Sequence, residues 1–110
     1  MILTRNYDLD IIPGGLPLLI RVSCNDTSSR LVFSLFAGEG VLALPNNLAA
    51  TIQGREAHKT ASYLLEDSTP KVTLDLDKTM TGKKGLLPLE IVLSSGDYIL
   101  VTTTFYLDVR

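Results

Sequence analysis

The sequence predicts a single all-β domain, and three observations support this. Apolar residues recur at every second position in short runs, a spacing that places alternate side chains on opposite faces of a strand. Clusters of Gly, Pro, Asn, Asp and Ser separate these runs at intervals of about 8–12 residues. No segment of helical length is amphipathic. The 110 residues suit one domain with one core.

The alternation locates each strand in chain order. At the start, Tyr7, Leu9 and Ile11 share one face while Asp8 and Asp10 share the other. The run 30–36 is apolar on parts of both faces, which predicts a central strand. The predicted strands span residues 7–12, 18–23, 30–36, 41–44, 48–53, 60–65, 71–76, 86–93 and 98–109.

Turn signals separate these strands. Residues 94–97 read as a hairpin turn, and residues 77–81 as one helical turn that Asp77 caps and Gly82 closes. Pro88 cannot donate to a strand ladder, so it is predicted to lie at an edge, at a bulge or at the start of its strand. Residues 54–59 form a polar excursion between two strands.

Eight or nine short strands without intervening helices exclude a parallel βαβ architecture. The predicted fold is therefore an antiparallel β-sandwich, with a small β-barrel as the alternative. Residues 1–110 are predicted to form one domain, in which residues 1–6 are an N-terminal attachment arm.

Composition excludes several functional classes. The formal net charge is −2, without the basic stripe that nucleic-acid binding needs. Cys24 is the only cysteine, so no intrachain disulfide can form. The apolar runs are shorter than a membrane span, and the charged N-terminal segment is unlike a signal peptide. These features predict folding in a reducing cytoplasm.

Candidate chemical groups are sparse, and we predict no catalytic residue, cofactor or metal site. His58 is the only histidine and reads as a solvated residue, because a general base needs a positioned partner. Cys24 has no neighbouring histidine to activate its thiol. The close carboxylates in 8–10 and 75–77 lie on exposed strand faces; calcium is their functional alternative, but the spacing is not that of an EF-hand.

Carbohydrate binding is the alternative function. Glycan sites commonly present aromatic platforms, whereas this chain has no tryptophan and only 6% aromatic residues. Three tyrosines could make such contacts if they are exposed on the surface, namely Tyr63, Tyr98 and Tyr106.

Several segments together resemble one known family. They are Tyr-Asp-Leu-Asp-Ile-Ile-Pro-Gly-Gly at 7–15, Arg-Leu-Val-Phe-Ser-Leu-Phe at 30–36, Leu-Glu-Ile-Val-Leu at 89–93 and Phe-Tyr-Leu-Asp-Val at 105–109. In this order and spacing, with supporting matches at 49–54 and 80–81, they resemble the N-terminal domain of phage baseplate upper proteins. The similarity extends over nearly all of the chain.

The resemblance implies a virion structural protein that acts as an attachment or assembly adaptor in a baseplate, tail or head-fibre apparatus. The family is found in phages and prophages of Gram-positive bacteria, usually followed by a fibre or receptor-binding region. The sequence stops at Arg110, which favours attachment over host recognition. Expected partners are other virion proteins and copies of the chain itself, after folding in the host cytoplasm.

Two partner-binding surfaces are predicted. An apolar arm ahead of the first strand could pair with the sheet edge of a partner. The second surface combines an edge strand near Pro88 with the lysine turn that precedes it, which could meet an acidic neighbour. The predicted contact residues are Met1, Ile2, Leu3, Thr4, Arg5, Lys83, Lys84 and Pro88.

Overall fold

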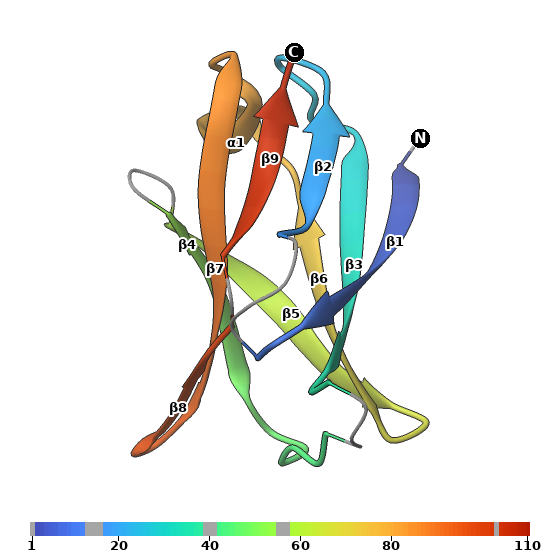
Figure 1. The fold of residues 1–110 in the computed structure, drawn as a ribbon, viewed down its shortest axis with the longest axis vertical. Helices are drawn as coiled ribbons and strands as arrows, with labels where there is room; N and C mark the ends of the chain where they lie inside the picture. The colour runs from blue at the N-terminus through green and yellow to red at the C-terminus, as the bar shows by residue number, and fades with distance from the viewer. Residues whose placement is uncertain (1, 13–16, 39–41, 55–57, 103) are drawn as a thin grey trace.

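The computed structural model describes residues 2–12, 17–38, 42–54, 58–102 and 104–110, and these are almost entirely β-structure (Figure 1). The all-β prediction is confirmed. In chain order the elements are β1 (Leu3–Asp10), β2 (Leu19–Val22), β3 (Ser29–Phe36), β4 (Ala49–Gly54), β5 (His58–Glu66), β6 (Thr69–Asp75), α1 (Lys78–Thr81), β7 (Gly85–Ser95), β8 (Tyr98–Val101) and β9 (Phe105–Val109).

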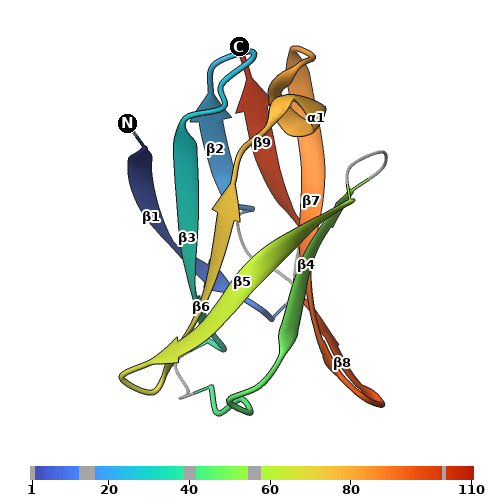
Figure 2. The same cartoon turned by 180° about the vertical axis from the view of Figure 1, so that it is seen from behind.

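The strands form one strongly curled sheet. Hydrogen bonding links them in the order β1-β3-β6-β5-β4-β7-β9-β2, and β8 pairs with β7 beside this path. The curl brings the two ends of the path together (Figures 1 and 2), where Arg5 Nη1 of β1 donates to the Arg21 carbonyl of β2 at 2.8 Å. The result is a curled half-barrel, intermediate between the predicted sandwich and its barrel alternative.

Two long strands produce the curl because each is shared between different neighbours. The first part of β5 pairs with β4, and the part from Ser62 to Glu66 pairs with β6. Similarly, β7 pairs with β9 up to Leu89 and with β8 from Val92 onward, while β4 lies along its other side. These strands therefore carry the ladder around the core from one face to the other.

The prediction of an antiparallel fold is wrong at both ends of the sheet. β1 pairs with β3 in parallel, and β2 pairs with β9 in parallel. A parallel pair requires a crossover between its strands. The connection between β1 and β3 contains β2, which lies at the opposite end of the strand path. The crossover between these parallel strands therefore contains a strand, whereas such crossovers usually contain an α-helix.

Two predicted strands are not found as single strands, and the bounds of the other strands shift by up to four residues. Within the predicted strand 41–44, Val41 lies outside the described residues, and 42–44 form no strand, although Leu42 and Leu44 pack against the core. The predicted strand 98–109 divides into β8 and β9, since Thr102 bonds to Ile91 by its side chain as well as its backbone. The described part of the excursion at 54–59 belongs to β4 and β5.

The core consists of the alternate residues that the pattern placed inward. Leu31, Phe33 and Leu35 of β3 are all buried, and β3 lies between β1 and β6, as a central strand should. The Phe33 and Phe105 rings, from opposite parts of the path, have centroids 4.8 Å apart. Burial of each such ring stabilises the fold by about 1.5–3 kcal/mol, so this pair helps to hold the curled sheet closed.

The turns confirm two local predictions. Asp77 caps α1 by accepting a hydrogen bond from the Thr79 amide at 3.0 Å, and Gly82 is its C-cap. The β7–β8 hairpin turns at Gly96, whose φ is +57°. The β5–β6 hairpin instead places Asp67 and Ser68 at φ 49° and 64°, as a type I′ turn requires at both central positions.

Candidate interaction surfaces

The N-terminal residues form part of the sheet rather than an arm. Met1 lies outside the described residues, whereas Leu3, Thr4 and Arg5 begin β1 and pair with Ser29, Arg30 and Leu31 of β3. The prediction of an unpaired arm over 1–6 is therefore wrong, because β3 provides a ladder for β1 from Leu3 onward. Within the described chain β1 still has only one neighbouring strand, and Ile2 and Leu3 are 56% and 57% exposed.

The predicted lysine turn lies within a larger cluster of cations, which we call the basic end. Lys83 and Lys84 are exposed between α1 and β7, at the end of the domain where β9 also finishes (Figure 1). The cluster consists of Arg21, Lys78, Lys83, Lys84 and Arg110. Sequence reasoning found only the two adjacent lysines, since the pairing of β2 with β9 is what adds the arginines.

One carboxylate holds the arginines of the basic end. Asp108 Oδ2 lies 2.9 Å from Arg110 Nε and 4.0 Å from Arg21 Nε. The Asp108 side chain is only 14% exposed, whereas those of Arg21 and Arg110 are 69% and 63% exposed. The carboxylate therefore orients the two guanidinium groups while leaving them available to an anionic partner.

Pro88 lies beside this end on the outer face of β7. It is opposite Tyr106 of β9, and Tyr106 is in turn opposite Leu19 of β2. These three side chains form an apolar row next to Leu86, which is 64% exposed. Through Leu86, this apolar row adjoins the lysine turn, so the predicted residues Pro88, Lys83 and Lys84 belong to one surface.

The location of Pro88 agrees with its chemistry. The prediction of an edge strand near Pro88 is wrong, since β7 lies between β4 and β9. However, the β4 ladder extends only to Leu89, so Pro88 is one position beyond it. The amide of Tyr106 donates to the Leu18 carbonyl at 2.9 Å, so Tyr106 directs its backbone groups away from Pro88. A residue without an N–H is tolerated there.

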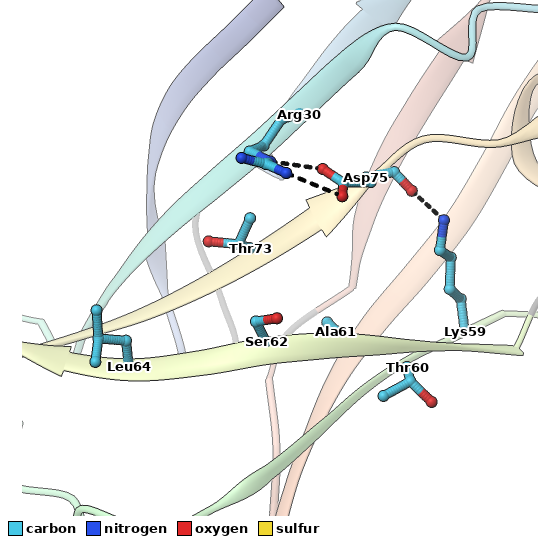
Figure 3. A pocket seen from close by; sticks show the side chains of 8 residues that line it. All are labelled: Arg30, Lys59, Thr60, Ala61, Ser62, Leu64, Thr73 and Asp75. Atoms are coloured by element: carbon cyan, nitrogen blue, oxygen red, sulfur yellow. Dashed lines mark hydrogen bonds and ion pairs between the residues drawn. The ribbon is translucent and has the colours of Figure 1, made fainter. Parts of the chain in front are cut away.

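A shallow groove of about 350 Å³ crosses the outer face of β3, β6 and β5 (Figure 3). Arg30 donates through Nε and Nη2 to the two carboxylate oxygens of Asp75 at 2.7 and 3.2 Å. Lys59 donates to the Asp75 carbonyl and lies 3.1 Å from Asp77. The remaining lining side chains are Thr60, Ala61, Ser62, Leu64 and Thr73.

Hydrogen bonding keeps the carboxylates around this groove ionised. The bond from Arg30 lowers the pKa of Asp75. For Asp77, burial raises the pKa, but the hydrogen bonds from Thr79 and Lys59 outweigh this and the pKa is lowered overall. The lining of the groove therefore combines paired charges with hydroxyl groups, a surface suited to neutral polar ligands.

The β7–β8 hairpin projects from the end opposite the basic end (Figure 2). Tyr98, Ile99 and Val101 of β8 are 41%, 68% and 43% exposed. Of the other tyrosines considered for glycan contact, Tyr63 donates its hydroxyl to the Pro45 carbonyl at 2.8 Å, and Tyr106 is half-buried. Tyr98 is thus the most accessible of the three.

The individually considered groups do not converge. His58 is exposed at the start of β5 and pairs with Gln53, while Cys24 is half-buried beside the end of β9. Asp10 accepts hydrogen bonds from the Ile12 and Gly38 amides. Across the described residues no group of three or more His, Cys, Asp or Glu side chains could hold a metal ion. No described helix has the length and hydropathy to cross a membrane.

The fold belongs to the class of small, curled all-β domains that contain parallel edge pairs. This fold is similar to that of a solved structure, the N-terminal domain of phage TP901-1 ORF48, with a TM-score of 0.69 over 98% of this chain and 99% of that one. The two sequences are 12% identical, so the similarity concerns the fold. No protein-family model and no curated protein matches the chain.

Proposed function

We propose that this chain is a structural component of a phage particle, in which it attaches one virion protein to another and catalyses no reaction. The observation that carries the proposal is the end-to-end correspondence of its fold with an N-terminal domain of a phage protein. The resemblance of its ordered motifs to the N-terminal domain of baseplate upper proteins supports the same role.

The surfaces of the domain suit attachment. The basic end combines exposed cations with the apolar row of Leu19, Pro88 and Tyr106, and such a combination of apolar contact and charge favours a protein partner. The outer edges of β1 and β8 have no neighbouring strand in the described chain, so they could add a strand from a baseplate, tail or capsid protein.

The proposal is tested on particles of the phage or prophage that encodes the chain. Purified particles are analysed by quantitative mass spectrometry, and we expect the chain at several copies per particle, in a fixed ratio to a tail, baseplate or capsid protein. Crosslinking should then connect it to that protein. Its absence from purified particles, while it is abundant in the lysate, would contradict the proposal.

Carbohydrate binding is a second candidate, which the groove beside Arg30 and Asp75 favours. Thr60, Ser62 and Thr73 line the same groove as this ion pair, and hydroxyl groups can donate and accept hydrogen bonds with a sugar. Titration with host cell-wall glycans tests it, using Ser62→Val and Thr73→Val as variants. Heat released by the native chain and lost in both variants would favour this role.

A further inference from the structure

Formal charge is divided unevenly along the 35 Å axis of the domain. The basic end has five cations, Arg21, Lys78, Lys83, Lys84 and Arg110, against the two carboxylates Asp26 and Asp108, which gives +3. The pairs Arg30–Asp75 and Lys59–Asp77 add no net charge. Since the whole chain has a formal charge of −2, its other residues together carry −5, including those at 39, 55 and 56, which lie outside the described residues.

The basic end is held together by backbone hydrogen bonds from three separate parts of the chain. The Cys24 amide donates to the Arg110 carbonyl at 3.0 Å, and the Asn25 amide donates to the Thr81 carbonyl at 2.7 Å. The Thr81 side chain is buried and its hydroxyl donates to the Asp26 carbonyl at 2.9 Å. These hydrogen bonds fix the backbone that carries the cations before a partner binds, which lowers the entropic cost of binding.

The opposite end of the domain has the complementary charge, and we call it the acidic end. Glu66 and Asp67 lie at the β5–β6 turn, and Asp97 lies at the β7–β8 turn. Both turns project from the end remote from α1 and the C-terminus (Figures 1 and 2). The three carboxylates are exposed, and the nearby cation Lys71 lies 3.7 Å from Glu66.

Exposed apolar side chains accompany the charges at both ends. Leu86 and Leu19 are 64% and 50% exposed beside the basic end. Leu64 and Ile99 are 60% and 68% exposed beside the acidic end. Contact between unlike ends would therefore bury apolar surface while pairing opposite charges, whereas contact between like ends would oppose equal charges.

We propose that the basic end binds the acidic end of a second copy of this chain, so that copies associate head to tail. The area is sufficient, because an end with extents of 29 × 25 Å can bury roughly 1,000 Å² in total, near the lower limit for a specific contact. Such a contact is heterologous, so it forms a ring if the rotation closes and an open stack if it does not.

The test uses the isolated chain and two charge-reversal variants, so it is independent of the proposed virion role. Lys83→Glu/Lys84→Glu makes both ends acidic, and Glu66→Lys/Asp97→Lys makes both ends basic. Analytical ultracentrifugation compares low ionic strength, with a Debye length of about 30 Å at 0.01 M, with about 1 M salt, where it is about 3 Å. Thermal unfolding confirms that each variant is folded.

At low salt we expect the average mass of the native chain to reach at least about twice the 12.0 kDa of one copy. At high salt the average mass should fall back towards that of one copy. Each variant alone should remain at the mass of one copy, and an equal mixture of the two should associate again. A native chain that stays monomeric at low salt would overturn the proposal, even if it binds a separate acidic protein. Association that either variant retains unaided would also overturn it.

Discussion

Thr102 and Ile91 exchange a reciprocal pair of hydrogen bonds between β7 and the gap that separates β8 from β9. The Ile91 amide donates to the Thr102 hydroxyl at 3.0 Å, and the Thr102 amide donates to the Ile91 carbonyl at 3.0 Å. Thr102 is only 3% exposed. The Thr102 hydroxyl therefore takes the place of a backbone carbonyl as the acceptor for the buried Ile91 amide, at the point where the regular β7–β8 ladder ends.

Replacing this hydroxyl should destabilise the domain. Thr102→Val keeps the shape but leaves the Ile91 amide without its acceptor, so the free energy of unfolding should fall by about 1–3 kcal/mol. Urea denaturation measures the change. Thr102→Ser is the matched control, because it keeps the hydroxyl and should retain most of the stability. An unchanged stability of Thr102→Val together with a loss in Thr102→Ser would show that the methyl group, and not the hydrogen bond, matters.

The β5–β6 turn should accept a stabilising substitution. Ser68 has a φ of 64°, in the left-handed region that costs a residue other than glycine about 1–2 kcal/mol. Ser68→Gly creates an Asp-Gly turn, the preferred type I′ sequence, and should raise the free energy of unfolding by about 0.5–1 kcal/mol. Ser68→Val is the opposite control and should lower it. Thermal unfolding of the three proteins decides the matter.

Acid should weaken the fold partly through Asp26. Its carboxylate accepts bonds from the Ser29 hydroxyl at 2.7 Å and the Ser28 amide at 2.8 Å, and these lower its pKa from 3.8. Because the unfolded chain binds the proton more readily, this stabilisation is present above pH 3.8 and is lost as the pH falls through the lower folded pKa.

The Asp26→Asn variant isolates this contribution. Its free energy of unfolding should depend less steeply on pH than that of the native chain below about pH 4, and denaturation at a series of pH values measures both slopes. Asp75 and Asp77, whose pKa values are also lowered, should preserve part of the slope in the variant. Identical slopes would exclude a role for Asp26.

The ion pair of Arg30 and Asp75 should contribute little to stability. The two side chains are 39% and 54% exposed, and solvent screens such pairs. A double-mutant cycle with Arg30→Gln and Asp75→Asn should therefore give a coupling energy below about 1 kcal/mol, measured by urea denaturation. A larger value would mean that the groove holds this pair in a less solvated setting than its exposure indicates.

The core was predictable from the sequence because burial follows period-two alternation. Leu31, Phe33 and Leu35 are spaced two residues apart, and a strand can bury them together only on one face. The N-cap at Asp77 was predictable for a similar reason, since a side-chain acceptor at that position bonds locally. Local chemistry determines both features.

Sheet order and the interaction surfaces could not be predicted in the same way. The pairing of Leu19 with Tyr106 joins residues far apart in the chain, and no local pattern specifies it. For that reason the two lysines at 83 and 84 were recognisable as a basic turn, while the contribution of Arg21 and Arg110 was not. The alternation in 98–109 likewise gave no sign that Thr102 would leave the ladder.

The position of β2 has a consequence for how the chain folds. β2 follows β1 closely in the chain, yet its strand partner is β9, which ends at Val109. During synthesis on a ribosome, β2 can therefore pair with β9 only after almost all of the described chain has emerged, and such non-local pairing is slow. Until then its ladder edge is open to other nascent chains, so rapid synthesis at high copy number is the condition under which this domain would most readily misfold.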